Sequence, residues 1–326
     1  MTLPYVLRLI CLCAAAFFLV HAALGLLLRL AARPIIQFAH RMKPREATHF
    51  LLLVRFLPVA ASSFVVLSIC LPSYLWFESG ATKENVGAGF VIAALLGALI
   101  WIASLLRVGR AVAAAGQLVR KWKESCTESK FPGVSPPVEI LESDAPVLLL
   151  AGVLRPRLVL SSGVLRSLSP QQLHSALRHE EAHRASRDNF KRLLLLLSPE
   201  IFPFARSFDL MDEAWALFSE WAADDDASGS NPEQSLTLAE SLVRVARMGA
   251  APRPAPLCTS FIPPDQDLAA RVNRLLLPSS FQSELWRRLR AIFAGTACTL
   301  LVLLTFVLSR PSALQSVHQL LERLSH

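Results

Sequence analysis

Four long apolar runs stand out from the mixed and polar stretches of the chain. They cover residues 9–28, 56–77, 86–106 and 291–309. A helix needs about 20 residues, at about 1.5 Å each, to cross the hydrocarbon core of a bilayer. The pattern therefore predicts an α-helical membrane protein with four transmembrane helices. Three lie in residues 1–110, a polar domain fills residues 111–290, and the last helix and a short tail occupy residues 291–326.

The polar domain follows an Ala-rich, basic helix that is predicted to run to about Lys130. Three prolines and a glycine in residues 131–137 end that helix. Short apolar runs separated by turn-forming residues come next, and they predict two or three small strands at residues 138–141, 147–150 and 157–160.

Helices are predicted further along this domain. Ser169 is a good N-cap, Pro170 suits the first turn, and Gln172 completes a capping box, so a helix should begin at Pro170. Residues 208–227 also have a helical pattern. Residues 251–264 contain five prolines and are predicted to form a loop.

Composition and charge support a membrane protein. The chain is 53% hydrophobic and only 18% charged, against about 25% charged residues in ordinary soluble domains. Its net charge of +8 would raise the question of nucleic acid binding. However, residues 107–290 hold 23 Lys and Arg against 21 Asp and Glu, so the excess lies on segments that flank the apolar runs. No direct nucleic acid binding is expected, and the six cysteines show no CxxC spacing.

The basic residues predict the orientation in the membrane. They gather after the first run, after the third run and before the fourth, as at Arg29, Arg107 and Arg287. By the positive-inside rule, the first loop and the polar domain are cytoplasmic and both termini lie outside a bacterial inner membrane. Arg55, at the cytoplasmic edge of the second run, is interpreted as a side chain that extends to the interface.

The helix that begins at Pro170 carries the motif His179-Glu180-Glu181-Ala182-His183, an HExxH sequence. Its two histidines lie one turn apart on one face, so their imidazoles can bind a single zinc ion. Glu180 is turned far enough to reach a water on the metal rather than the metal itself. The alternative is a solvated helix face on which charges happen to alternate.

Catalytic zinc needs a third protein ligand. His174, the other histidine of the polar domain, lies five residues before His179, about 140° around the helix, and cannot reach the same ion. A carboxylate from a later helix must serve, and the candidates are Glu213, Glu220, Asp224, Asp225 and Asp226. Glu220 with Asp224 four residues later would offer one ligand and one acceptor for a ligating histidine N–H. The alternative for the three aspartates is a solvated helix end, which would oppose the helix macrodipole.

Two segments carry a resemblance to a known family. Residues 148–190 read LLLAGVLRPRLVLSSGVLRSLSPQQLHSALRHEEAHRASRDNF, and residues 219–226 read SEWAADDD. Both resemble the membrane zinc peptidases of the BlaR/MecR antirepressor family. The resemblance implies a zincin-like α+β domain of the gluzincin type with one zinc per chain. By this resemblance Glu220 is the third ligand, Asp224 supports a ligand, and Arg187 and Asp188 are a structural pair after the zinc helix.

The resemblance also implies a function. The substrate would be a transcriptional repressor, of the winged-helix type, or the protein itself, cleaved on the cytoplasmic face in signal transduction. Only 17 residues follow Ser309, so no extracellular penicillin-binding sensor domain is expected. Two alternatives stay open: a signalling or scaffold protein that keeps the fold without cleaving, and a quality-control protease similar to HtpX.

Two further assignments complete the predicted site. The strand edge formed by Val147, Leu148, Leu149 and Leu150 could hold a substrate peptide as an added strand. Arg271 lies in a segment that resembles the family's helix after the third ligand. It is a candidate for stabilising the oxyanion or for a structural contact, and the alternative is a surface charge.

Overall fold

The computed structural model describes most of the chain up to Leu277. The described residues are 4–77, 87–123, 126–131, 137–201, 206, 208–229, 231–249, 257–261 and 268–277, with isolated positions between 288 and 299. They form a mostly helical protein with one small mixed sheet. Apart from isolated positions, the predicted fourth transmembrane helix and the tail after it lie outside the described residues.

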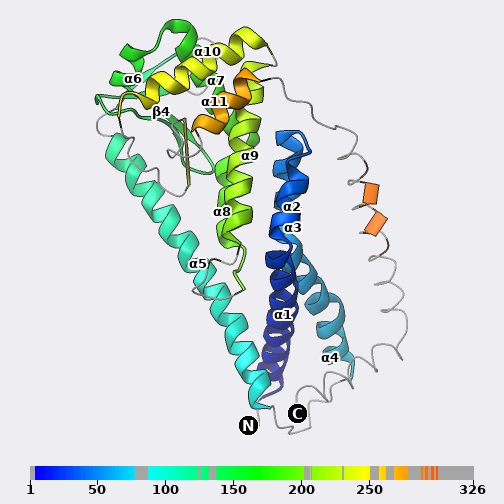
Figure 1. Ribbon diagram of the computed structural model, residues 1–326. Helices are drawn as coiled ribbons and strands as arrows, with labels where there is room; N and C mark the ends of the chain where they lie inside the picture. The colour runs from blue at the N-terminus through cyan, green and yellow to red at the C-terminus, as the bar shows by residue number, and fades with distance from the viewer. Residues whose placement is uncertain are drawn as a thin grey trace.

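Within the described residues, three helices are long and apolar enough to cross a membrane (Figure 1). The first is α1 (Tyr5–Leu30). The second joins α3 (Pro44–Val65), a π-helical turn η1 (Val66–Cys70) and α4 (Leu71–Phe77), and the third is α5 (Ala88–Lys123). A short helix, α2 (Ala32–Ala39), connects the first two. These three helices include the first two apolar runs of the sequence and residues 88–106 of the third.

The helix α5 ends earlier than the sequence predicts. It stops at Lys123, and Cys126–Ser129 form a strand, β1, instead of the end of a helix. Strand β1 pairs antiparallel with β2 (Val138–Leu141), so the prediction of a helix to about Lys130 is wrong. The ladder hydrogen bonds to β2, which a local pattern cannot reveal, decide the conformation here.

The sheet contains five strands in the order β1-β2-β4-β3-β5. Strands β3 (Leu148–Ala151) and β4 (Arg157–Ser161) confirm the predicted strands, and β2 pairs with β4 in parallel. The fifth strand, β5 (Cys258–Ser260), lies inside the segment predicted as a loop. That prediction is wrong at these residues, which contain no proline and pair with β3.

Strand β3 is therefore an inner strand. It pairs antiparallel with β4 on one side and with β5 on the other. The predicted peptide-binding edge at Val147, Leu148, Leu149 and Leu150 is wrong, because the backbone groups on both sides of Leu148–Ala151 already face neighbouring strands.

Helices cover both faces of the sheet. One face packs its leucines against α7 (Pro170–Ser186) and α10 (Pro232–Ala246), and the other packs against the end of α5 through Leu118 and Trp122. All four residues of β3 are buried as a result. Such a strand presents a continuous apolar sequence rather than an alternating one, which explains the run of leucines in β3.

Helix α7 begins as the sequence predicts. Ser169 Oγ accepts from the Gln172 backbone N–H at 3.3 Å, and Gln172 Oε1 accepts from the Ser169 N–H at 3.1 Å. This capping box satisfies two backbone donors that the first turn leaves free. The helix ends at Arg187, whose φ of 54° places it in the left-handed region. The chain turns there directly into α8 (Asp188–Leu197).

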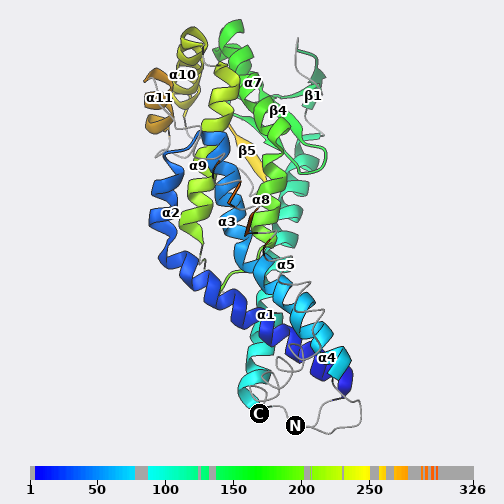
Figure 2. The same cartoon turned by 90° about the vertical axis from the view of Figure 1, so that its right-hand side faces the viewer.

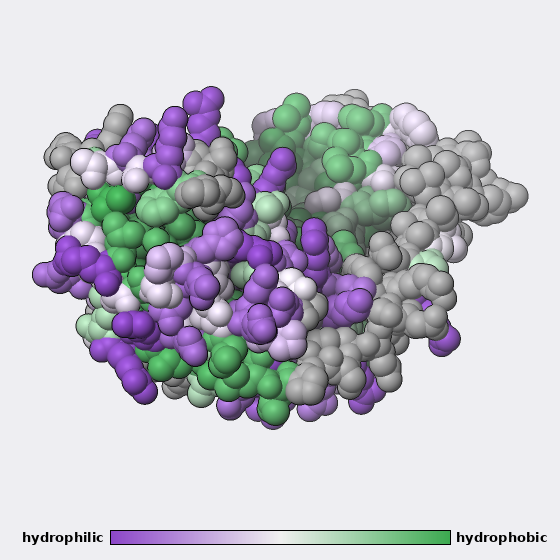
Figure 3. All heavy atoms as spheres, turned by 90° about the horizontal axis from the view of Figure 1, so that it is seen from above, coloured by the Kyte–Doolittle hydropathy of each residue, from purple (hydrophilic) through white to green (hydrophobic). Residues whose placement is uncertain are grey.

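The remaining helices are α6 (Ser162–Ser167), α9 (Asp209–Ser228) and α11 (Leu268–Leu276). Helix α9 confirms the helix predicted for residues 208–227. Figures 1 and 2 show α8 and α9 reaching from the sheet end of the molecule toward α1, α3 and α5. Hydrophilic residues cover much of the surface at the sheet end (Figure 3).

Candidate metal centre

Helices α7 and α9 bring three ligand groups together. His179 and His183, one turn apart on α7, approach each other with their Nε2 atoms 3.1 Å apart. Glu220 of α9 places its Oε2 atom 3.4 Å from His179 Nε2 and 3.5 Å from His183 Nε2. Among the described residues, these side chains form a group that could hold a metal ion.

The spacing of the three atoms fits a tetrahedral ion. Zinc binds imidazole nitrogen and carboxylate oxygen at about 2.0–2.1 Å, and tetrahedral ligands at that radius lie about 3.3 Å apart. The three observed separations of 3.1, 3.4 and 3.5 Å surround this value. Two imidazoles and one carboxylate, with a fourth position left for water, are also the donor set of many catalytic zinc sites.

Glu180 lies beside this group and is completely buried. Neither of its carboxylate oxygens has a hydrogen-bond partner in the described part of the chain. Burial raises the pKa of Glu180 to about 7, although the imidazoles of His183 and His179 oppose this rise. An unpaired buried carboxylate is costly, so its place next to the three ligand atoms indicates a group meant to interact with something bound there.

Each histidine is oriented by a carboxylate on its other ring nitrogen. His183 Nδ1 donates to Asp188 Oδ2 at 2.7 Å, and His179 Nδ1 lies 3.0 Å from Asp224 Oδ1. A proton held on Nδ1 leaves the Nε2 lone pair free for a metal. Ser219 Oγ also donates to Asp188 Oδ2 at 2.9 Å, which ties the start of α8 to α9. The sequence did not indicate this role for Ser219, although it directly precedes Glu220.

Arg271 is part of the site and not a surface charge. It is fully buried, and its Nε and Nη2 atoms bind both oxygens of Asp224 at 2.9 and 2.6 Å. Its Nη1 atom lies 3.2 Å from Glu220 Oε2 and donates to the Phe261 carbonyl at 3.2 Å. The interpretation of Arg271 as a surface charge is wrong, because the face of α11 that carries Arg271 packs against α9.

These contacts hold the acidic groups in their charged form. Burial alone would raise the pKa of Asp224, but the Arg271 guanidinium and the hydrogen bond with His179 outweigh it and hold this pKa at about 2. Burial would likewise lower the pKa of His183, yet Glu220 and Asp188 raise it to about 10 in the metal-free protein. In the metal-free protein the proton on His183 therefore helps to balance the carboxylates of Glu220 and Asp188, and a metal ion would take the place of that proton.

None of the other four acidic candidates lies next to the Nε2 atoms of both histidines, and Asp224 contacts His179 at Nδ1 instead. Glu213 and Asp226 are exposed, and Asp225 forms a bidentate pair with Arg274 at 2.6 and 2.7 Å. Only Glu220, of the five candidates, places a carboxylate oxygen next to both imidazoles.

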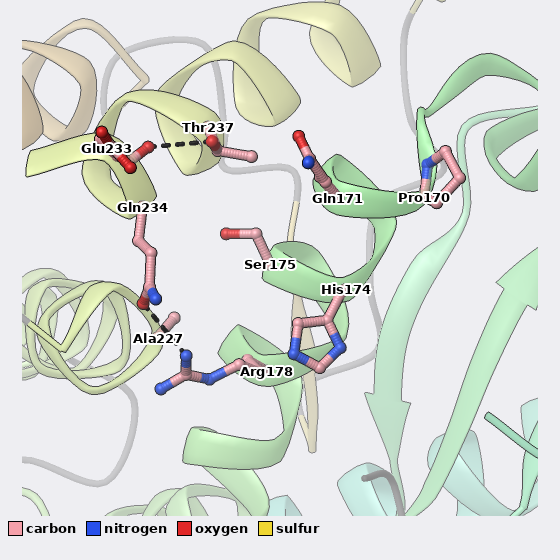
Figure 4. Close-up of a pocket in the computed structure, with 9 residues that line it drawn as sticks. All are labelled: Pro170, Gln171, His174, Ser175, Arg178, Ala227, Glu233, Gln234 and Thr237. Carbon is pink, nitrogen blue, oxygen red and sulfur yellow. Dashed lines mark hydrogen bonds between the residues drawn. The ribbon is translucent and has the colours of Figure 1, made fainter. Parts of the chain in front are cut away.

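His174 also lies away from the metal group. Figure 4 shows it lining a separate pocket between α7 and α10, together with Arg178 and Gln234. Arg178 Nη1 donates to Gln234 Oε1 at 3.1 Å in that pocket. The helical spacing that excluded His174 as a ligand agrees with this placement.

Little of the metal group reaches the surface. His179, His183 and Glu180 are fully buried, and the Glu220 side chain is 12% exposed. Arg192 of α8 lies at this exposed side, 3.8 Å from Glu220 Oε1.

Comparison with protein-family models and with curated proteins found no match.

Proposed function

We propose that the chain is a membrane-embedded zinc endopeptidase. The observation that carries the proposal is the pairing of two features: three ligand atoms with tetrahedral spacing, and a buried Glu180 carboxylate without a partner beside them. A scaffold protein would have no need for this carboxylate, since an unpaired buried charge lowers stability. A hydrolase needs it as a base.

The residues of the site have distinct tasks in peptide hydrolysis. His179, His183 and Glu220 would hold zinc, which supplies a Lewis acid that activates water and polarises the peptide carbonyl. Glu180 takes one proton from the attacking water and delivers it to the amine of the departing fragment, so the carboxylate is regenerated in each cycle. Asp188 and Asp224 keep the imidazoles in the tautomer that leaves Nε2 free.

The wider setting of the proposal follows from the sequence. We infer a gluzincin-like domain in residues 111–290, a fourth transmembrane helix at residues 291–309, and a relationship to the BlaR/MecR peptidases. The substrate would then be a repressor protein or the chain itself. The basic flanks put the domain on the cytoplasmic side of a bacterial inner membrane. A cytoplasm-active reporter fused near Lys130 should be active; a silent reporter would reverse this orientation.

The replacement Glu180→Gln tests the enzyme directly. It keeps the size of the side chain but removes the proton acceptor, so zinc content should match the parent chain. General-base catalysis is typically worth about 10²–10⁴ in rate, so cleavage should become undetectable. New protein N-termini can be compared in cells that express the parent or the variant. Termini found only with the parent support the peptidase. Identical termini, with zinc in both proteins, would favour the scaffold.

A further inference from the structure

Helix α9, which carries the ligand candidate Glu220, and helix α8, which begins with the His183 partner Asp188, share a second anchor near the membrane helices. At the metal end, Asp188 begins α8 and Glu220 lies on α9. The opposite ends of both helices meet in the connection between them, residues 198–208, of which 198–201, 206 and 208 are described. Helix α8 packs against α5 and α9 packs against α3 (Figure 2). The described residues 198–201 and 208, which we call the α8–α9 connection, thus lie among the membrane helices.

Arg55 of α3 binds this connection with all three of its side-chain nitrogens. Nη1 donates to Ser198 Oγ at 2.8 Å, Nη2 to Glu200 Oε1 at 3.3 Å, and Nε to Asp212 Oδ1 at 3.2 Å. Its guanidinium also lies 4.0 Å from the centre of the Phe208 ring. The Arg55 side chain is 1% exposed. The sequence-based interpretation of Arg55 as a side chain that extends to the interface is therefore wrong.

The other two membrane helices contact the same short segment. On α1, His21 Nε2 donates to the Pro199 carbonyl at 3.1 Å. On α5, Arg107 Nη2 donates to the Ser198 carbonyl at 3.3 Å, and its Nη1 lies 3.6 Å from Glu200 Oε1. Each of α1, α3 and α5 therefore contributes one polar side chain to residues 198–200.

Close packing accompanies these polar contacts. A Cβ atom added at Gly25 of α1 would lie 2.7 Å from Ile201 and 3.2 Å from Phe208. Ile201 and Phe208 are 2% and 1% exposed. A larger residue at position 25 therefore forces the Ile201 side chain, and with a bulky residue the Phe208 ring as well, away from α1.

Buried ionic groups of this kind favour one arrangement strongly. Charges removed from water are tolerated only when they are paired, and removal of one partner leaves an uncompensated charge. Here two arginines, from α3 and α5, face the two carboxylates of Glu200 and Asp212. A relative movement of the membrane helices would separate these pairs unless the connection moved with them.

We propose that the α8–α9 connection lets the membrane helices control the metal site. Helix α8 has 10 residues, so about 15 Å separates the connection from Asp188. Displacement of the connection would move Asp188 and Glu220 relative to the histidines of α7. Arg55 is then a positioning residue for the site. The proposal rests on metal binding by the proposed peptidase and does not depend on peptide cleavage.

The test uses the full chain purified in detergent and measures zinc affinity by competition with a chromophoric chelator. Gly25→Leu should force the connection outward and weaken zinc binding at least tenfold. Gly109→Leu is the matched control, because nothing lies within 4 Å of a Cβ at that position. The double variant Gly25→Leu with Ile201→Ala removes the Ile201 side chain that the new leucine would meet. It should restore the zinc affinity of the parent. The visible spectrum of bound Co²⁺ should change in the single variant and return in the double variant.

A second test compares Arg55→Gln, which should weaken zinc binding, with the control Arg110→Gln, which should not. Arg110 suits the control because it is exposed on α5. If Gly25→Leu and Arg55→Gln fold and bind zinc like the parent, the control by the membrane helices is refuted while the zinc site stands. A parent chain that binds no zinc refutes the proposed function itself.

A measurement on the parent chain covers the case in which the variants do not fold. Coupling between two sites is reciprocal, so zinc should slow amide hydrogen exchange at residues 198–201 as well as around Glu220. Protection confined to α7 and to α9 near Glu220 would overturn the proposal.

Discussion

Two clusters of charged side chains lie along α8 and α9, one where the two helices connect and one at the metal group, and they differ in how their polar atoms are paired. Near the membrane helices, Arg55 uses all three side-chain nitrogens on Ser198, Glu200 and Asp212. At the metal end, both carboxylate oxygens of Glu180 lack a partner within the described residues. The first cluster is stabilised by the chain alone, whereas the second leaves polar atoms that a bound group could pair with.

The comparison separates two kinds of buried charge that look alike in a sequence. A paired cluster stabilises one arrangement of helices, and its loss should appear mainly in folding and geometry. An unpaired group next to convergent ligand atoms should appear mainly in binding and chemistry. Arg271 belongs to both kinds, because it pairs with Asp224 and also borders Glu220.

Arg271→Ala should therefore have the largest effect. It leaves the buried Asp224 carboxylate without its bidentate partner, which should cost about 3–5 kcal/mol of stability. Loss of support for His179 and Glu220 should weaken zinc binding about 10- to 100-fold. Thermal unfolding and chelator competition measure the two effects.

Arg274→Ala is the matched control for that change. Arg274 lies one turn further along α11 and pairs with Asp225, whose side chain is 45% exposed. Arg274 itself is 10% exposed and also donates to the Trp221 carbonyl at 3.3 Å. Its removal should cost about 1–2 kcal/mol, less than that of Arg271, and leave zinc affinity unchanged. Equal effects of the two replacements would show that Arg271 acts only as an ordinary ion pair.

The pH dependence of zinc binding is a smaller and more specific test. Because Glu220 and Asp188 raise the pKa of His183 to about 10, zinc must displace a proton from this histidine at neutral pH. Apparent affinity should rise about tenfold per pH unit between about pH 6 and 8. The proton on His183 stabilises the metal-free fold at low pH, and this contribution is lost as the pH rises through about 10.

Asp188→Asn should lower the pKa of His183, so the pH above which zinc affinity stops rising should fall. Titration of zinc affinity at several pH values measures it. A parent chain whose zinc affinity does not change with pH would contradict the protonated state of His183 in the metal-free site.

Local patterns in the sequence predicted helix α7 and the approach of its two histidines well. The spacing of His179 and His183 and the capping box at Ser169 depend on residues within one or two turns of each other. The same holds for the three described apolar helices, because their length and composition are local properties.

Features that depend on distant contacts could not be predicted in this way. Arg271 is buried because α11 packs against α9. Its partner there, Asp224, lies 47 residues earlier in the chain. Arg55 is paired with Asp212 across 157 residues. Strand β5 consists of three residues beside prolines, and only its pairing with β3 makes it a strand. In each case the tertiary contact overrides the local signal.

The most direct test of the metal centre is X-ray absorption at the zinc edge on the purified chain. The account predicts one zinc ion with four nitrogen or oxygen ligands at about 2.0–2.1 Å, two of them imidazoles. Glu220→Ala should lose most of this zinc, whereas His174→Ala should keep it. Sulfur ligands, a chain without zinc, or full zinc content in Glu220→Ala would contradict the assignment of His179, His183 and Glu220 as the metal site.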